Sequence, residues 1–117
     1  TIHASDRWQL LMGPSWGQYG THVYEGIFIH SIPCTNPNPY NVPASAYNLL
    51  GNPASHGCIR MTVEATKWIY YNCSGSKLTI FDGQSVYYNA FKGPLGKTPL
   101  IKINGNVDPT DVDALKK

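Results

Sequence analysis

Glycine and proline divide the apolar residues of this 117-residue chain into short runs. The chain holds eleven glycines and nine prolines, and no apolar run approaches the length of a long buried helix. Short apolar runs between turn residues are typical of strands, and the eight tyrosines add residues that favour strands. The sequence therefore predicts a mainly β fold with many loops.

Size and charge exclude several classes of protein. A chain of 12.9 kDa is one domain at most, and it is long enough to bury a core. With 42% hydrophobic and only 14% charged residues, it does not have the composition of a disordered chain. The net charge of +2 gives no reason to expect nucleic acid or an anionic membrane as a partner. No run reaches the roughly 20 apolar residues of a membrane span.

The first half of the chain carries the clearest strand signals. Residues 8–12 form one candidate strand, and residues 22–24 and 27–30 flank a Glu-Gly pair as in a tight hairpin. Alternation along the second hairpin strand places Phe28 and His30 on one face. Residues 33–53 contain four prolines within eleven residues, which forbids a central strand there. We expect a long functional loop with short helical turns over residues 44–50.

One helix is expected in the second half, over residues 61–72. Thr62 suits its N-cap, and Gly75 lies near its end. A helical periodicity predicts a buried stripe at four positions, namely Ala65, Trp68, Ile69 and Asn72. Further strands are expected at residues 77–81, 86–88 and 100–103, followed by a linker from residue 104.

The segment Ser55-His56-Gly57-Cys58-Ile59-Arg60 concentrates reactive side chains. A cysteine attacks as the thiolate, which is favoured by a neighbouring base, a cation or a helix N-terminus. The sequence offers all three near Cys58: a histidine two residues before it, an arginine two residues after it, and the expected helix downstream. The glycine lets the backbone turn sharply and bring N–H groups to a substrate carbonyl.

A second histidine, His30, ends a predicted strand and opens into the long loop through Ser31. A base at the edge of a cleft could take the proton of Cys58. A single histidine at a strand end is more often structural, and a single cysteine is more often a small buried apolar residue. The run from residue 55 to residue 60 is different, because packing in a helix or a strand does not require it.

These two motifs, Ile29-His30-Ser31 and the run 55–60, together resemble the signature of the L,D-transpeptidase catalytic domain of the YkuD type. The similar region extends from about residue 8 to residue 82. The resemblance implies a β-sandwich-like fold with one helix after the catalytic cysteine. It also implies an extracytoplasmic bacterial enzyme of the cell wall that needs no metal or organic cofactor.

The resemblance further implies a mechanism. Cys58 would attack the peptide bond before the terminal D-residue of a peptidoglycan stem and form a thioester. An amine of a neighbouring stem would resolve the thioester into a 3→3 cross-link, or water would hydrolyse it. His30 would be the base, oriented by the backbone carbonyl of Ser31. The remaining motif residues would shape the pocket, supply oxyanion donors or contact substrate: Ser55, His56, Gly57 and Arg60. Carbapenem β-lactams would act as acyl donors and inhibitors.

The chain departs from the family pattern in three ways. The loop between the two motifs is longer than usual, and Arg60 stands where other branches have asparagine. The opening strands of the family domain have too few residues before His30, so we expect an N-terminally incomplete sheet with an open edge. We assign residues 1–83 to the catalytic domain and residues 84–117 to C-terminal strands and a linker.

Two further cysteines, Cys34 and Cys73, could form a disulfide if Cys58 is the reactive thiol. Closing this loop of about forty residues would stabilise the fold by roughly 4 kcal/mol on the chain-entropy model. The alternative is two free, partly buried thiols.

Three other interpretations compete. A zinc site would use Cys58 and His56 with further ligands from His30, His22, His3 or Cys34. A papain-like peptidase would place the cysteine before the histidine, which is the reverse of the order here. A non-catalytic wall-binding or structural remnant would use the tyrosines as a contact surface.

Overall fold

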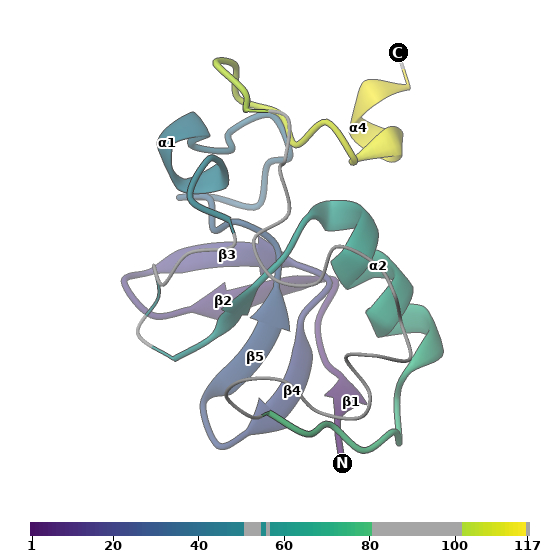
Figure 1. The fold of residues 1–117 in the computed structure, drawn as a ribbon. Coiled ribbons are helices and arrows are strands. Elements are labelled where there is room, and N and C mark those ends of the chain that lie inside the picture. The colour runs from purple at the N-terminus through teal and green to yellow at the C-terminus, as the bar shows by residue number, and fades with distance from the viewer. Residues whose placement is uncertain (51–54, 56, 81–101, 117) are drawn as a thin grey trace.

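The computed structural model describes residues 1–50, 55, 57–80 and 102–116, and the described strands form two sheets (Figure 1). The predicted mainly β fold is confirmed. In chain order the elements are β1 (His3–Ala4), β2 (Trp8–Leu11), β3 (Ser15–Gln18), β4 (Thr21–Tyr24), β5 (Ile27–His30), α1 (Ala44–Tyr47), β6 (Ile59–Arg60), α2 (Val63–Asn72) and α4 (Val112–Leu115).

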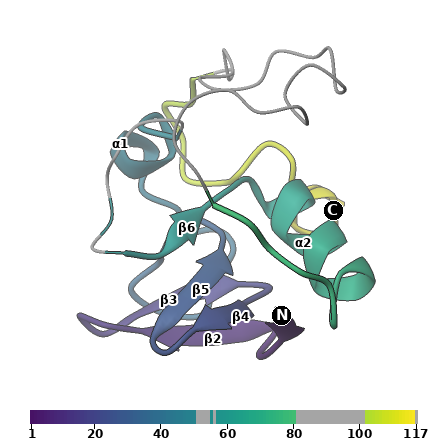
Figure 2. The same cartoon turned by 60° about the horizontal axis from the view of Figure 1, so that its bottom comes forward.

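The larger sheet has the strand order β1-β4-β5-β6, and β2 and β3 pair as a separate hairpin. The predicted hairpin of β4 and β5 is confirmed, with Glu25 in the left-handed region (φ 48°) at its turn. Strand β6 lies parallel to β5, as Figure 2 shows. The sequence does not signal β1, β3 or β6, because β1 and β6 have only two residues each and β3 contains a glycine.

The outer edge of β1 is not open, contrary to expectation. The N–H of Ile2 donates to the carbonyl of Ser76 (2.9 Å), and the N–H of Gly75 donates to the carbonyl of Ile2 (2.7 Å). The N–H of Ala4 donates to the hydroxyl of Ser74 (2.7 Å). The segment after α2 therefore satisfies the backbone groups that would otherwise be exposed at this edge.

Helix α2 begins where the sequence predicts, because the Thr62 hydroxyl accepts the N–H of Ala65. The predicted buried stripe is wrong. Val63 and Thr66 are the buried positions, whereas Trp68 is 62% exposed. The polar Thr66 can be buried because its hydroxyl donates to the carbonyl of Val63 (3.0 Å).

Residues of the long loop form a buried hydrophobic cluster next to its short helix. The predicted helical turns are confirmed as α1, and Tyr47 at its end is buried with Ile32, Cys34 and Val42. The backbone of Cys34 pairs with that of Trp16 through two hydrogen bonds of 2.8 Å. Strand β3 is thereby joined to the chain that follows β5.

The C-terminal part differs most from expectation. Residues 77–80 are not a strand, because no strand of the described chain pairs with their backbone. The side chain of Ile80 is 69% exposed. Residues 102–103 are likewise not a strand. The expected strand at 86–88, residues 81 and 100–101, and the boundary at 83 lie outside the described residues. No helix in the described part is long and apolar enough to cross a membrane.

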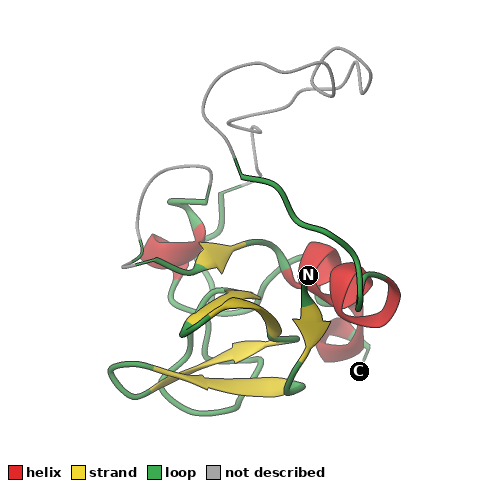
Figure 3. Cartoon of the chain, turned by 90° about the horizontal axis from the view of Figure 1, so that it is seen from below, coloured by secondary structure: helices red, strands yellow, loops and turns green. Residues whose placement is uncertain are grey.

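The tail is not a linker, because it packs on the fold. The N–H of Val42 donates to the carbonyl of Asn106 (2.8 Å), and just before the tail the side chain of Asn48 bonds both the N–H and the carbonyl of Ile103, each at 2.8 Å. Helix α4 lies beside α2, where Lys67 and Asp113 form an ion pair of 2.9 Å. Figure 3 shows both helices on the same side of the strands.

Candidate active site

Two parallel strands bring His30 and Cys58 together. In the register of β5 and β6, Ile29 is level with Ile59 and His30 with Arg60. Carried back by one residue, this register places Cys58 beside Phe28. Because side chains alternate across a sheet, the cysteine and the histidine belong to the same face, two positions apart on neighbouring strands. Figure 2 shows the two strands side by side.

The thiol of Cys58 lies at the hairpin end of this face and is partly exposed. The N–H of Phe28 donates to Sγ at 3.5 Å, and Sγ lies 3.8 Å from the carbonyl oxygen of Gly26. No hydrogen bond joins Sγ to the imidazole of His30, although the structure describes both residues.

The imidazole of His30 is fixed through its Nδ1 atom. Its Nδ1 lies 2.5 Å from the carbonyl oxygen of Ser31, as the resemblance implies. A carbonyl only accepts, so Nδ1 carries the proton and Nε2 keeps a lone pair. Burial lowers the pKa of His30; the Ser31 carbonyl raises it, and the positive charge of Arg60 lowers it further. The side chain is 2% exposed, and its uncharged form suits a base.

Strand β3 packs directly against the imidazole of His30 and limits where the ring can lie. A Cβ added at Gly17 would lie 2.8 Å from Nδ1 of His30, closer than real Cβ contacts allow. The next residue, Gln18, donates its N–H to the hydroxyl of Ser31 (2.8 Å) and accepts the N–H of Ser31 (3.2 Å). Sequence reasoning missed both residues, since nothing local in the sequence marks a contact with a strand further along the chain.

The turn before β6 is closed by Ser55. Its hydroxyl donates to the carbonyl of Cys58 (2.5 Å) and accepts the N–H of Gly57 at 3.4 Å. Gly57 has φ 144°, a conformation that side chains disfavour, so glycine is needed here. His56 lies outside the described residues.

Arg60 stands level with His30 in the sheet register. Its Nε is buried and has no hydrogen-bond partner within the described residues. A buried guanidinium nitrogen without a partner is costly, which leaves a donor available to an anionic group.

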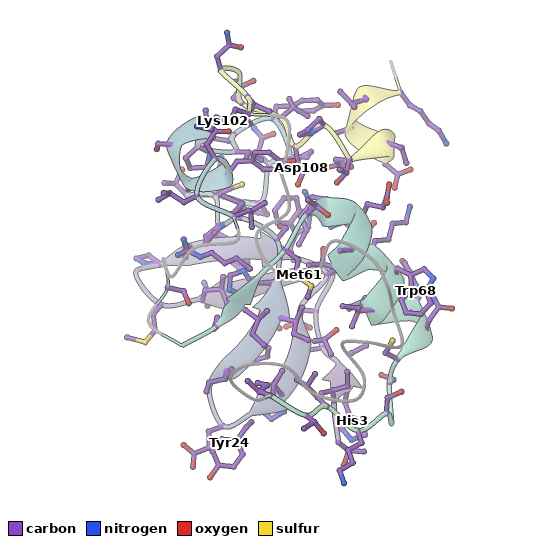
Figure 4. All side chains as sticks on the ribbon, viewed as in Figure 1. His3, Tyr24, Met61, Trp68, Lys102 and Asp108 are labelled. Atoms are coloured by element: carbon purple, nitrogen blue, oxygen red, sulfur yellow. The ribbon has the colours of Figure 1, made fainter. Side chains whose placement is uncertain are left out.

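The N-terminus of α2 does not face the thiol with free N–H groups. Its first donors are occupied: Val63 donates to the carboxylate of Asp108 and Glu64 to the hydroxyl of Thr110, both at 2.9 Å. The expected help of the helix N-terminus to Cys58 is therefore wrong, because the C-terminal tail caps the helix. Figure 4 shows Asp108 beside the start of α2.

The other two cysteines are separate from the site. Cys34, Cys58 and Cys73 are all free thiols, so of the two alternatives left open for Cys34 and Cys73 the structure has the free thiols. Cys34 belongs to the core beside α1, whereas Cys73 ends α2. Burial raises the pKa of Cys34 to about 11, which keeps this thiol protonated. In the described parts of the chain, no three histidine, cysteine or acidic residues are grouped as metal ligands would be.

Comparison with known proteins gives two matches. The family model of the L,D-transpeptidase catalytic domain, YkuD, matches residues 2–103. The chain is also similar to the Bacillus subtilis (strain 168) protein named "Putative L,D-transpeptidase YciB", with 38% identity over 58 residues. The aligned part covers 50% of this chain and 26% of that relative, so it spans about a quarter of the relative's length. No solved structure matches the chain.

Proposed function

The chain belongs to the family of L,D-transpeptidase catalytic domains, and we propose that it is a peptidoglycan L,D-transpeptidase with Cys58 as nucleophile and His30 as general base. One observation carries the assignment of the two residues. Cys58 directly precedes β6, and extending the β5–β6 register by one residue places it on the face of His30; the imidazole is fixed by Ser31 with its basic nitrogen free of that contact.

The proposed reaction begins when the thiol turns away from Gly26 and gives its proton to Nε2 of His30. The sulfur attacks the carbonyl carbon of the peptide bond before the terminal D-residue of a stem peptide. The C–N bond breaks, the amine leaves with the proton from the imidazole, and a thioester to Cys58 remains. The amine of a neighbouring stem then attacks the thioester carbonyl and gives its proton to the imidazole. The C–S bond breaks, the Cys58 sulfur leaves and takes that proton back, and a 3→3 cross-link is formed; water in place of the amine gives hydrolysis.

Ser55, Gly57 and Arg60 have supporting roles in this proposal. The turn closed by Ser55 holds the backbone of Cys58, and we assign the N–H of Cys58 to the developing oxyanion. Arg60 has a buried donor that no described residue accepts, so we assign it to a carboxylate of the stem peptide. The substrate implies an extracytoplasmic location at the cell wall. Carbapenems are the proposed inhibitors, because ring opening by the thiolate would leave the same kind of thioester.

The test is turnover of a disaccharide tetrapeptide purified from bacterial peptidoglycan. Wild type should release the terminal D-residue and form a dimer with a 3→3 cross-link, both identified by tandem mass spectrometry. Cys58→Ala should do neither, whereas Cys73→Ala should keep both activities. Folded wild-type protein that binds cell-wall sacculi without any turnover would favour the non-catalytic alternative.

A further inference from the structure

We propose that Asp111 of the C-terminal tail and Gln18 of β3 are positioning residues for His30, connected to its imidazole through Ser31. The catalytic consequence rests on the proposed function, but the geometry does not. The tail was expected to be a linker, and the family model ends at residue 103. The inference therefore assigns a role to a segment that lies beyond the matched family domain.

The connection nearest the imidazole is made by backbone groups. Gln18 and Ser31 exchange two hydrogen bonds: the Gln18 N–H donates to the Ser31 hydroxyl, and the Ser31 N–H donates to the Gln18 carbonyl. Ser31 in turn accepts the Nδ1 proton of His30 through its own carbonyl. A shift of β3 relative to β5 would therefore move the group that fixes the imidazole tautomer.

The side chain of Gln18 extends this connection to the tail. Its Nε2 donates to Oδ2 of Asp111 at 3.1 Å, and Oδ1 of the same carboxylate accepts the N–H of Ala114 as the N-cap of α4. Gln18 is 1% exposed and Asp111 is 3% exposed. Buried polar groups lose more when a partner is removed than exposed ones do, so this contact constrains where β3 can sit.

The tail is fixed firmly enough to serve as an anchor. Asp108 is 1% exposed and caps α2 through the N–H of Val63, while its other oxygen accepts both the N–H and the hydroxyl of Thr110. Helix α2 follows directly on β6, which carries Arg60 after Cys58. The tail thus contacts Gln18, which bonds Ser31 next to His30, and it contacts α2, which follows the strand after Cys58. Figure 4 shows Asp108 and Met61 near the start of this helix.

Three variants separate positioning from general stability. Asp111→Ser keeps an N-cap oxygen for α4 but is too short to reach Gln18. Asp111→Asn can cap α4 with its oxygen and donate its amide to Oε1 of Gln18, an atom without a partner within the described structure. Asp113→Asn is the matched control, because it removes an exposed carboxylate of the same helix that forms its ion pair with Lys67 and does not contact Gln18.

The first measurement is the ¹⁵N spectrum of the His30 imidazole as a function of pH. In wild type we expect the Nδ1–H tautomer and a titration midpoint below 6.5. Asp111→Ser should mix the tautomers and move the midpoint toward 6.5, because a loosened imidazole is better hydrated. The charge that acts on His30 comes from Arg60 of β6, and it is unchanged in all three variants.

The second measurement is the rate at which a carbapenem acylates Cys58. Asp111→Ser should slow it by about tenfold, since misplacing a reacting group by 1 Å can cost about 100-fold. Asp111→Asn and Asp113→Asn should stay within about twofold of wild type. An unchanged rate, midpoint and tautomer in folded Asp111→Ser would overturn the proposal, as would an equal loss in Asp113→Asn.

The two proposals can fail separately. If wild type is never acylated, the proposed function fails, while the imidazole spectra still test the positioning. If Asp111→Ser does not fold by circular dichroism, Gln18→Met replaces it, because methionine keeps the volume and removes the donor. If neither variant folds, the contact serves stability and the positioning role is wrong.

Discussion

Replacing Gly17 with alanine should displace the imidazole of His30 without changing any polar group. The added Cβ would lie 2.8 Å from Nδ1, 2.9 Å from Cβ and 3.0 Å from Cγ of His30. Ordinary van der Waals contact begins at 3.4 Å, so the strand and the ring must separate by about 0.6 Å. Catalytic groups need placement within about 0.5 Å, and we expect acylation to slow by about tenfold.

The assay for Gly17→Ala is the single-turnover rate of carbapenem acylation, followed by the mass of the intact protein. Overpacking should also lower the free energy of unfolding by about 1–3 kcal/mol, so folding is checked by urea denaturation. Gly105→Ala is the control, because its Cβ would meet nothing within 4 Å. An acylation rate for folded Gly17→Ala equal to that of wild type would refute the claim that β3 sets the position of the base.

Two further predictions concern stability. Burial lowers the pKa of His30 in the folded state. Below about pH 6.5 the unfolded chain therefore binds a proton at His30 more readily than the folded protein does. The free energy of unfolding should fall as the pH drops from 6.5 toward the folded pKa. Urea denaturation at several pH values should show this slope, and His30→Asn should lack it. Asp108→Ala should lower the free energy of unfolding by about 1–3 kcal/mol, because it leaves the buried N–H of Val63 without its acceptor. Asp113→Asn should change it by less than about 0.5 kcal/mol, and equal losses would contradict the capping role.

The sequence was sufficient where structure depends on neighbouring residues. The turn at Glu25-Gly26 and the N-cap at Thr62 each act within a few positions, and each is found as predicted. The contact of His30 with the Ser31 carbonyl was anticipated only through the resemblance of Ile29-His30-Ser31 to the family motif. The resemblance in these motifs then supplied the fold class, which local patterns alone give only as mainly β.

The sequence was insufficient where distant segments meet. Gln18 and Asp111 are 93 positions apart, and Asp108 caps a helix that begins 45 positions earlier. Polar residues in an apparent linker give no sign that they will be buried. The α2 stripe failed for a related reason: a hydroxyl that bonds the helix backbone lets Thr66 occupy a buried position that its polarity argues against.

The central claim is that Cys58 is an acyl-accepting nucleophile, and intact-protein mass spectrometry after exposure to a carbapenem tests it most directly. We predict one adduct with the mass of the whole inhibitor, mapped by tandem mass spectrometry to Cys58 and absent from Cys58→Ala. Folded wild type that gains no mass, or a Cys58→Ala variant that still carries the adduct, would contradict the account.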